Sequence, residues 1–397
     1  MIKVFVTGLG CVSASGMNVE EHLDAFRHEK APLLSEERSR TGENYALARI
    51  PLSNDELKQR LSLSPSECIT RTALLGMLAA REAYDDAGLT ERKNHKIAFI
   101  SATSAGGMEL TEQFYPAFQD NPQNGRLRLV KGHDAGDSTE QIAHLLHLTG
   151  FRTTISTACS SGANALMLAA RLIRAGWYDT VIAGGSDALC RFTIEGFHSL
   201  HILDASPCKP FDAHRNGLNL GEGAAYLVLQ SENALSHTPY AELAGWGNAN
   251  DAFHQTASSD EGIGATLAMA EALRTAHVQP VEIDYIHAHG TATLNNDLTE
   301  SRAIKEQFTD HIPAFSSTKP FTGHTLGAAG AIGALFSVLT IREKIRLPNL
   351  HFEVPMEETG WIPVRNVQHH EVKRVLSNAF GFGGNDSSLL FCKSELS

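Results

Sequence analysis

The amino-acid sequence predicts an α/β fold made of two similar halves. Strand-like apolar segments alternate with helical segments along the chain, which is typical of a sheet whose strands are joined by helical crossovers. An apolar strand that ends in glycines at 3–10 recurs at 241–247, and the layout of 156–175 recurs at 316–341. A repeat this long indicates a duplicated domain rather than a solenoid. The two halves are expected over residues 1–235 and 236–397.

Local signals predict the elements of each half. Apolar residues at helical spacing followed by Gly88 predict a helix over 68–87, whereas the polar stretch 31–66 predicts an irregular surface excursion. The segment 326–341 has almost no polar residue, so we expect a helix buried on all sides, with a sheet on either side of it. Further helices are expected at 18–29, 138–149 and 265–276, and strands, some with their glycine turns, at 1–16, 97–100, 180–185, 224–230, 283–290, 375–384 and 387–391.

Composition excludes several classes of protein. The 397 residues are 42% hydrophobic and 20% charged, as in an ordinary globular protein, and no apolar run predicts a membrane span. The first eight residues form a strand-like segment too short for a signal-peptide core, so we expect a cytoplasmic protein. Six cysteines without a C-x-x-C pair argue against disulfides and structural zinc. The net charge of −12 argues against nucleic-acid binding.

Cys159 lies in the segment STACSSG, between an expected strand and an expected helix. A helix N-terminus stabilises a thiolate, and its free N–H groups can bind an oxyanion. Small neighbours such as Ala158 and Gly162 allow a substrate to approach closely. A buried structural cysteine is an equally good interpretation of this segment alone.

Two histidines of the second half favour a catalytic cysteine. His289 and His324 each lie next to a glycine at a strand-to-turn junction. One such histidine is more often a packed or surface residue. Two at matching ends of the duplicated unit are harder to explain by packing, so we expect both to face Cys159.

Four segments resemble the signature blocks of a known family, the elongating β-ketoacyl-acyl carrier protein synthases. They occur in the family's order and are TACSSG at 157–162, HGTAT at 289–293, KPFTGHTLGAAG at 319–330 and NAFGFGGN at 378–385. The resemblance implies a thiolase-like fold with five αβαβα layers, two βαβαβαβα halves and a dimer. A further resemblance is to ketosynthases of specialised pathways, such as aryl polyene assembly.

The resemblance implies a decarboxylative Claisen condensation that extends a fatty-acid, polyketide or polyene chain by two carbons. Cys159 would hold the acyl group, and its own N–H together with that of Phe382 would bind the oxyanion. Neutral His289 and His324 would donate hydrogen bonds to the malonyl thioester carbonyl. Lys319 would be a buried cation that organises the field around both imidazoles.

The resemblance also implies supporting roles. Phe382 would gate the acyl chain, and Thr291 and Thr293 would bind the pantetheine arm. Asp297 and Glu300 would form the family's acidic pair with a structural role, and Glu300 would also be the counter-ion of Lys319. The reaction implies no metal or redox cofactor, because the phosphopantetheine arm arrives on the acyl carrier protein.

Several positions depart from the family's usual pattern. Asn216 and Asn219 stand where an aspartate and a valine are usual, and the segment LNN at 294–296 replaces proline and small residues. These changes predict altered gating or an acyl group other than a plain saturated chain.

An acidic carrier partner requires a local basic surface on this acidic chain. The candidates are Lys58, Arg60, Arg71, Arg126, Arg128 and Lys131. The dimer could contain two copies of this chain or one copy and a related ketosynthase or chain-length factor.

Two other functions remain open from the sequence. A non-catalytic chain-length-determining partner generally lacks the nucleophile, whereas this chain keeps Cys159. A thiolase acting on coenzyme A thioesters uses a second cysteine near the C-terminus as base. Here the late glycine loop carries Phe382, and Cys392 lies in a terminal strand pattern.

Overall fold

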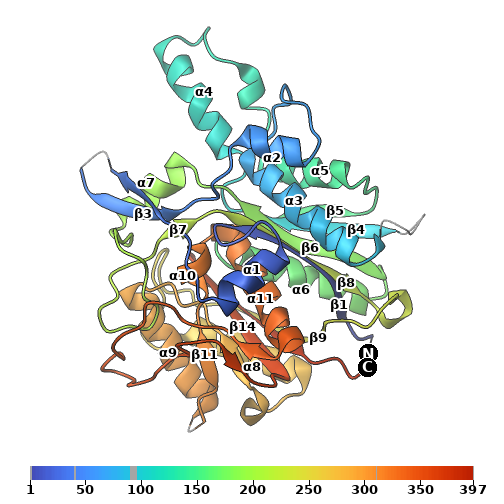
Figure 1. Ribbon diagram of the computed structural model, residues 1–397, viewed down its shortest axis with the longest axis vertical. Helices are drawn as coiled ribbons and strands as arrows, with labels where there is room; N and C mark the ends of the chain where they lie inside the picture. Colours follow the sequence, from blue (N-terminus) through green and yellow to red (C-terminus); the bar gives the residue numbers. More distant parts are fainter. Residues whose placement is uncertain (1, 40–41, 90–95, 310, 397) are drawn as a thin grey trace.

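The central sheet has ten strands and repeats one topology twice. The computed structural model describes all residues except 1, 40–41, 90–95, 310 and 397 (Figure 1). In each half the strands lie in the order third, second, fourth, fifth, first, and the two halves join where β1 pairs with β9. The strands are β1 (Phe5–Ser13), β4 (Ile97–Ala102), β5 (Arg152–Ile155), β6 (Thr180–Asp187) and β8 (Gly223–Gln230), then β9 (Ala241–Asn250), β10 (Tyr285–His287), β11 (Ala314–Ser316), β14 (Arg374–Gly381) and β15 (Asn385–Cys392).

The strand directions repeat as well. In each half the second strand pairs in parallel with the third and fourth, and the fifth pairs antiparallel with the fourth and first. The predicted α/β fold with two repeated halves is therefore confirmed. The predicted boundary after residue 235 falls in the connection between β8 and β9, beside a short 3-10 helix, η3 (Glu232–Ala234). That boundary stays a prediction.

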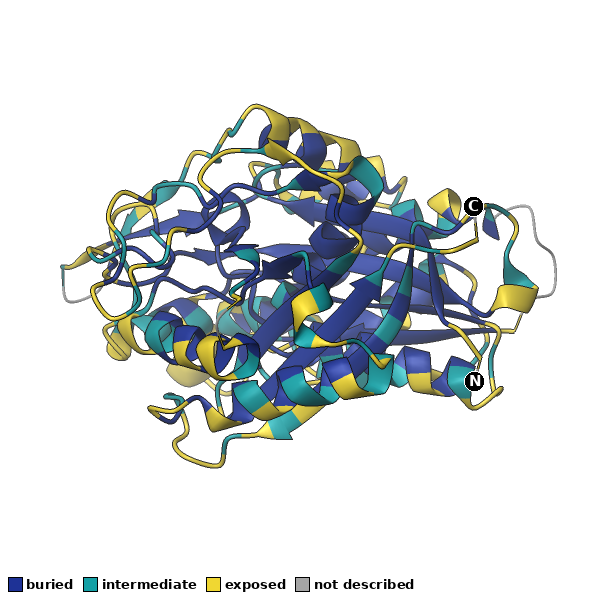
Figure 2. Ribbon diagram, turned by 90° about the horizontal axis from the view of Figure 1, so that it is seen from below, coloured by how far each residue is buried: buried dark blue, intermediate teal, exposed yellow. Residues whose placement is uncertain are grey.

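Helices lie in three layers around the two halves of the sheet. The outer layer of the first half contains α3 (Arg71–Asp86) and α5 (Ala135–Leu145), and that of the second contains α8 (Ile263–Ala276) and α9 (Leu294–Phe308). Between the two half-sheets lie α6 (Ser161–Arg174) and α11 (Ala329–Glu343), as Figure 1 shows. This arrangement gives the five αβαβα layers, and the sheet strands inside it are mostly buried (Figure 2).

The two central helices approach closely because small residues meet at their N-terminal ends. A Cβ on Gly162 would lie 2.6 Å from the backbone nitrogen of Ala331, and a Cβ on Gly330 would lie 2.8 Å from that of Ala163. Since both helices begin near this crossing, the turns that precede them are brought together. One of these turns carries Cys159 and the other carries His324.

The central helix α11 is buried as expected. Every residue from 330 to 341 is buried, and the 3-10 turn η5 (Leu326–Ala328) precedes the helix. The stretch Leu326–Glu343 is the one helix among the described residues that is long and apolar enough to cross a membrane by length and composition. It is 83% buried inside the protein, and it forms part of the central helical layer.

The predicted irregular excursion over 31–66 is wrong. It contains β2 (Ser35–Arg38) and β3 (Asn44–Ala48), which form a small sheet with β7 (Leu220–Gly221). It also contains α2 (Asn54–Arg60), whose N-terminus is capped by a capping box formed by Ser53 and Glu56. The sequence pattern did not reveal β3, because its parallel partner β7 lies far along the chain.

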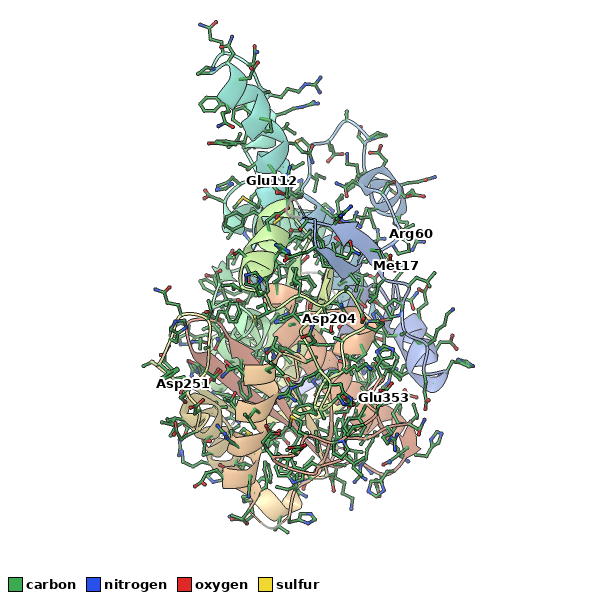
Figure 3. All side chains as sticks on the ribbon, turned by 90° about the vertical axis from the view of Figure 1, so that its left-hand side faces the viewer. Met17, Arg60, Glu112, Asp204, Asp251 and Glu353 are labelled. Carbon is green, nitrogen blue, oxygen red and sulfur yellow. The ribbon has the colours of Figure 1, made fainter. Side chains whose placement is uncertain are left out.

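Further elements flank the sheet. The sequence did not predict α4 (Met108–Asp120) and α7 (Arg191–Ser199), whereas α1 (Val19–Arg27) lies within the helix expected at 18–29. Figure 3 shows α4 projecting from the body, with Glu112 on it. The Glu112 carboxylate accepts the N–H groups of Arg191 and Phe192 at 3.0 and 2.8 Å, so it caps the first turn of α7. The remaining elements are η2 (Leu127–Leu129), η4 (Pro280–Glu282), α10 (Lys319–Thr322), β12 (Ile345–Arg346) and β13 (Gln368–His369).

Candidate active site

Cys159 occupies a sharp turn between β5 and α6. After β5 ends at Ile155, Ala158 adopts a left-handed conformation (φ 53°), which leaves Cys159 two residues before the helix begins at Ser161. The Cys159 side chain is buried, with the residue 5% exposed. The end of β14 lies against this turn, because Gly381 has no Cβ, and a Cβ there would lie 2.9 Å from the carbonyl oxygen of Thr157.

Two backbone N–H groups influence the charge of the cysteine sulfur. The N–H groups of Phe382 and of Cys159 itself both act on the thiol and favour its charged form. These are the two N–H groups that were predicted to form the oxyanion hole. The first lies in the β14–β15 turn and the second lies in the cysteine turn. The backbone geometry therefore fits the binding of an oxyanion next to the sulfur.

The free thiol is nevertheless neutral. Burial raises the pKa of Cys159 to about 11, and this effect outweighs the Lys319 charge and both N–H groups. The stabilisation that a helix N-terminus gives a thiolate therefore does not by itself ionise the resting thiol. The physical reason is desolvation, which disfavours a thiolate in a closed cavity.

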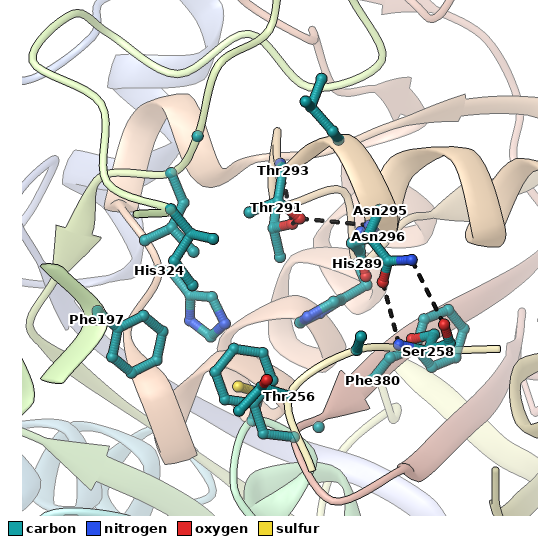
Figure 4. Close-up of a pocket in the computed structure, with 18 of the residues that line it drawn as sticks. Phe197, Thr256, Ser258, His289, Thr291, Thr293, Asn295, Asn296, His324 and Phe380 are labelled. Carbon is teal, nitrogen blue, oxygen red and sulfur yellow. Dashed lines mark hydrogen bonds between the residues drawn. The ribbon is translucent and has the colours of Figure 1, made fainter. Parts of the chain in front are cut away.

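His289 and His324 lie beside the sulfur. Ligand-type atoms of Cys159, His289 and His324 all lie within 4.8 Å of one another, and all three residues are buried. The two imidazole rings are 5.4 Å apart and nearly perpendicular, and Figure 4 shows them turned toward the same space. The first half therefore supplies the sulfur and the second half supplies two imidazoles.

Neighbouring donors determine which ring nitrogens carry the protons. The Leu326 N–H donates to Nδ1 of His324 at 3.1 Å, and the Lys319 ammonium lies 3.5 Å from Nδ1 of His289. Each Nδ1 therefore faces a donor, so the proton of each neutral ring sits on Nε2. Burial, and then the charge of Lys319, lower the pKa of both histidines well below the usual value.

This state favours hydrogen-bond donation from both rings to a carbonyl oxygen. Thiolate and imidazole are also the ligand types that zinc prefers. A metal ion at both Nε2 atoms would require each proton to move to the Nδ1 side, which already faces a donor. The arrangement fits two donors better than two metal ligands.

Lys319 begins α10 and reaches the backbone of His289. Its ammonium donates to the His289 carbonyl oxygen, and burial lowers its pKa. In the part of the chain that the structure describes, Lys319 forms no direct ion pair with its expected counter-ion Glu300. Glu300 instead accepts the N–H groups of His289 and Gly290, each at 2.8 Å.

The Glu300 carboxylate thus fixes the strand end that carries His289. Its charge still favours the charged form of Lys319, and Asn378 donates to it at 3.1 Å. Sequence reasoning missed the direct contacts because they join α9 to the backbone of a turn ten residues earlier. Glu300 acts as a buried anchor as well as a distant counter-charge.

Asp297 has the structural environment that the sequence analysis expected. Its carboxylate accepts the N–H groups of Phe211 and Ala292 at 2.7 and 3.1 Å, and Arg215 lies 3.8 Å away. The nearby hydroxyls of Thr291 and Thr293 are 2.9 Å apart. Thr293 also caps α9.

A cavity of about 290 Å³ leads to the three reactive groups (Figure 4). Both threonines line it, and so does Phe382, whose ring stacks on that of Phe197 at 5.5 Å. Sequence reasoning missed Phe197 and the wall at 256–258, because nothing local marks them as neighbours of the cysteine turn. Gly383 and Gly384, both with positive φ, give the Phe382 loop its shape.

The asparagine substitutions have two different environments. Asn216, Asn295 and Asn296 line the cavity, and Asn295 accepts the N–H of Ser258 at 3.0 Å. Asn219 is buried behind the cavity, where its side chain accepts the N–H of Cys208 at 2.8 Å. The expectation that Asn219 alters the gate is not supported by its contacts.

Two of the expected basic surface residues are not available at the surface. Arg71 forms an ion pair with the buried Glu222 at 2.8 Å. Lys58 is 8% exposed and donates to the Pro65 carbonyl at 3.0 Å. Four candidates remain exposed, namely Arg60, Arg126, Arg128 and Lys131.

The duplicated five-layered fold, together with a cysteine that faces two neutral histidines across one cavity, defines a thiolase-like condensing enzyme. The sequence matches the family "Beta-ketoacyl synthase, N-terminal domain" over residues 1–234 and "Beta-ketoacyl synthase, C-terminal domain" over 240–353. The chain belongs to the β-ketoacyl synthase family. The predicted activity, that of a β-ketoacyl-acyl carrier protein synthase and thus an acyltransferase, is confirmed.

Named relatives agree over nearly the full length. The 3-oxoacyl-[acyl-carrier-protein] synthase 2 of Staphylococcus aureus strain MRSA252 is 32% identical over 99% of both chains. The enzyme of the same name from Coxiella burnetii is 33% identical over 98% of both chains. The non-catalytic and thiolase alternatives are not favoured by these matches.

Solved structures are also similar. The ishigamide ketosynthase/chain length factor has a TM-score of 0.93 and 29% identity, with 99% of each chain covered. The ketosynthase ApeO in complex with its chain length factor ApeC, from Xenorhabdus doucetiae, has a TM-score of 0.82 and 31% identity, with 99% of this chain and 98% of that chain covered.

Proposed function

We propose that Cys159 carries the growing acyl chain while His289 and His324 activate the malonyl unit. The single observation that carries this proposal is the convergence of the three buried groups within 4.8 Å. In the first step the Cys159 sulfur bonds to the acyl carbonyl carbon, the carrier thiolate leaves, and it takes the proton that Cys159 lost. The N–H groups of Cys159 and Phe382 hold the oxyanion of this step.

In the second step the malonyl thioester carbonyl accepts both Nε2–H groups. The bond to the carboxylate breaks, carbon dioxide leaves, and the electron pair becomes an enolate held by two donors. The enolate carbon then attacks the acyl carbonyl on Cys159, and the cysteine sulfur leaves. The neutral state of both rings suits this step, because a proton that stays on Nε2 remains available as a donor.

The remaining predicted residues have roles of support. Thr291 and Thr293 offer hydroxyls to the amide-rich pantetheine arm, and Phe382 opens and closes the path of the acyl chain. Lys319 holds His289 in place. The arm reaches the site on the carrier, and the residues named here need no metal or redox cofactor for these steps.

Partial reactions test this proposal. We expect Cys159→Ala to abolish acyl transfer and retain malonyl-carrier decarboxylation. We expect His324→Ala to lower decarboxylation by about 10²–10³ and retain acylation of Cys159. Both activities are followed by mass spectrometry of the carrier. Loss of acyl transfer but not of decarboxylation in His324→Ala would contradict the assignment.

We further propose a substrate other than a plain saturated fatty chain, such as the polyene chain of a specialised pathway. The polar groups of Asn216 and Asn295 on the cavity wall support this. Competition between saturated and polyunsaturated acyl carriers in one turnover assay tests it. Equal or better use of the saturated carrier would contradict it.

We propose a dimer, with either a second copy or a related chain-length factor, that works with an acidic carrier protein in the cytoplasm. The similar ketosynthases that are solved with chain length factors support the heterodimer. Native mass spectrometry of protein purified from its own cells distinguishes the two dimers. For the carrier, charge reversal of Arg126 and Arg128 is expected to raise the Michaelis constant, and an unchanged constant would remove this loop from the proposal.

A further inference from the structure

Asp187 is a fully buried carboxylate next to the active site that the catalytic steps do not use. It ends β6, in the middle of the first half of the sheet, and it is 0% exposed. Burial raises its pKa, so the carboxylate carries a desolvation cost that four hydrogen-bond donors oppose. Its charge also raises the pKa of Cys159, which disfavours the nucleophile. A buried carboxylate that has both unfavourable effects requires a structural explanation.

The contacts of Asp187 reach both halves of the site. One oxygen, Oδ1, accepts the hydroxyl of Thr103 at 2.5 Å and the N–H of Ala105 at 2.9 Å. The other oxygen, Oδ2, accepts the N–H of Ser104 at 2.8 Å and the N–H of Gly327 at 2.7 Å. The carboxylate therefore joins the loop after β4 to the turn before α11.

The contacts with Ser104 and Gly327 connect Asp187 to the two reactive residues Cys159 and His324. The Ser104 hydroxyl donates to the carbonyl of Ala158 at 3.3 Å, and Ala158 directly precedes Cys159. On the other side, Gly327 follows Leu326, whose N–H holds Nδ1 of His324. Asp187 is thus connected to the cysteine turn through Ser104. On the other side it binds Gly327, which directly follows the N–H donor that fixes His324.

The junction has no spare room. A Cβ on Gly327 would lie 2.7 Å from Oδ2 of Asp187 and 2.8 Å from the Ser104 nitrogen. Only a glycine allows its N–H to approach the carboxylate while the two turns stay at this separation.

We propose that Asp187 is a positioning residue that sets the distance and orientation of the Cys159 turn relative to the His324 turn. The inference rests on the proposed function, in which an acyl group on one turn must meet an enolate held at the other. An amide at position 187 would point an N–H group at one of the N–H donors, so the junction would open on that side. A displacement of about 1 Å can cost about 10²-fold in rate.

The test compares Asp187→Asn with the wild type in two assays. The carbon–carbon bond-forming rate is expected to fall about 10²-fold. The rate of Cys159 alkylation by iodoacetamide at pH 8 is expected to rise, roughly tenfold for each unit by which the thiol pKa falls. The groups that act on this thiol are Lys319 and the N–H groups, which favour the thiolate, and Asp187, which opposes it. A merely structural defect would lower both rates.

A purely electrostatic role would raise alkylation and leave condensation unchanged, and this result would overturn the proposal. Gly327→Ala is the matched variant, because it disturbs the same junction and keeps the carboxylate. It is expected to lower condensation without the rise in alkylation. Full condensation activity in Gly327→Ala would also overturn the proposal, and this variant serves if Asp187→Asn fails to fold.

A readout without turnover separates this inference from the proposed function. The bifunctional reagent 1,3-dibromoacetone can bridge Cys159 Sγ and a ring nitrogen of His324 in the wild type, because ligand-type atoms of the two residues lie within 4.8 Å. We expect a lower yield of the bridged peptide in both variants, measured by mass spectrometry. An unchanged yield would contradict Asp187 as a positioning residue, whereas an inactive wild type that bridges normally would contradict only the proposed function.

Discussion

Replacement of Lys319 by methionine tests the electrostatic basis of the active site. Methionine has a similar length and no charge, so it removes the ammonium that lies 3.5 Å from Nδ1 of His289 and keeps much of the packing. The same charge lowers the pKa of His289 and His324 and favours the thiolate of Cys159. Three shifts therefore follow from one substitution: the pKa values of both histidines and of the cysteine rise.

The magnitude follows from the distance. Two unit charges 4 Å apart interact by about 4 kcal/mol at an effective dielectric constant of about 20, which gives the order of magnitude of the repulsion between Lys319 and a protonated His289. Loss of an ordered donor or charge at such a site typically lowers the rate about 10²–10³-fold. We expect a decrease of this size in malonyl decarboxylation by Lys319→Met at pH 7.

Two assays check this prediction. Nuclear magnetic resonance of histidine-labelled protein measures the imidazole titrations, and mass spectrometry follows decarboxylation of the malonyl carrier. Lys319→Arg is the matched control, because it keeps the charge while it changes the shape of the donor group. If the pKa of His289 is the same in Lys319→Met as in the wild type, the proposed role of the charge is refuted.

Three further predictions concern the cysteine, a tautomer and the central helices. Since burial raises the pKa of Cys159 to about 11, alkylation by iodoacetamide is expected to rise steadily from pH 7 to pH 10 without a plateau, whereas a plateau near pH 8 would show a thiolate at rest. His324→Gln places an amide N–H near the position of Nε2, whereas His324→Asn places it near Nδ1. The glutamine variant is therefore expected to retain at least about tenfold more decarboxylation activity than the asparagine variant, a difference of about 1.4 kcal/mol. Equal loss of activity in both variants would contradict the Nε2–H assignment. Gly162→Ala puts a Cβ 2.6 Å from the Ala331 backbone and should lower the free energy of unfolding in urea by about 1–3 kcal/mol, whereas the control Gly196→Ala, whose Cβ has no neighbour within 4 Å, should not lower it.

The sequence was informative wherever the local chain itself carries the constraint. The glycines and small residues around 162 and 330 predicted the buried helix, because a helix with no polar face must be covered on all sides. Cys159, His289 and His324 could be named as candidates because each lies at a strand-to-turn junction. The order of the repeated strands gave the two halves.

Contacts between distant segments were decided by the tertiary structure alone. A helix N-terminus favours the thiolate of Cys159, but burial in the folded protein outweighs that effect and raises the pKa of the thiol. Glu300 was expected to be a structural residue and the counter-ion of Lys319, but only the fold shows that it binds the backbone of the turn that carries His289. The partner of Arg71 lies 151 residues away, and the parallel partner of β3 lies about 170 residues away, where no local pattern can indicate them.

The sequence by itself therefore determined which residue types stand at the ends of the strands, and hence the family and the chemistry. Only the tertiary structure decided their protonation and separation, because desolvation and hydrogen-bond partners depend on what the folded chain packs against each group. Asp187 illustrates the difference. In the sequence it is one acidic residue at the end of a strand, whereas in the fold it joins the turn of the nucleophile to the turn of His324.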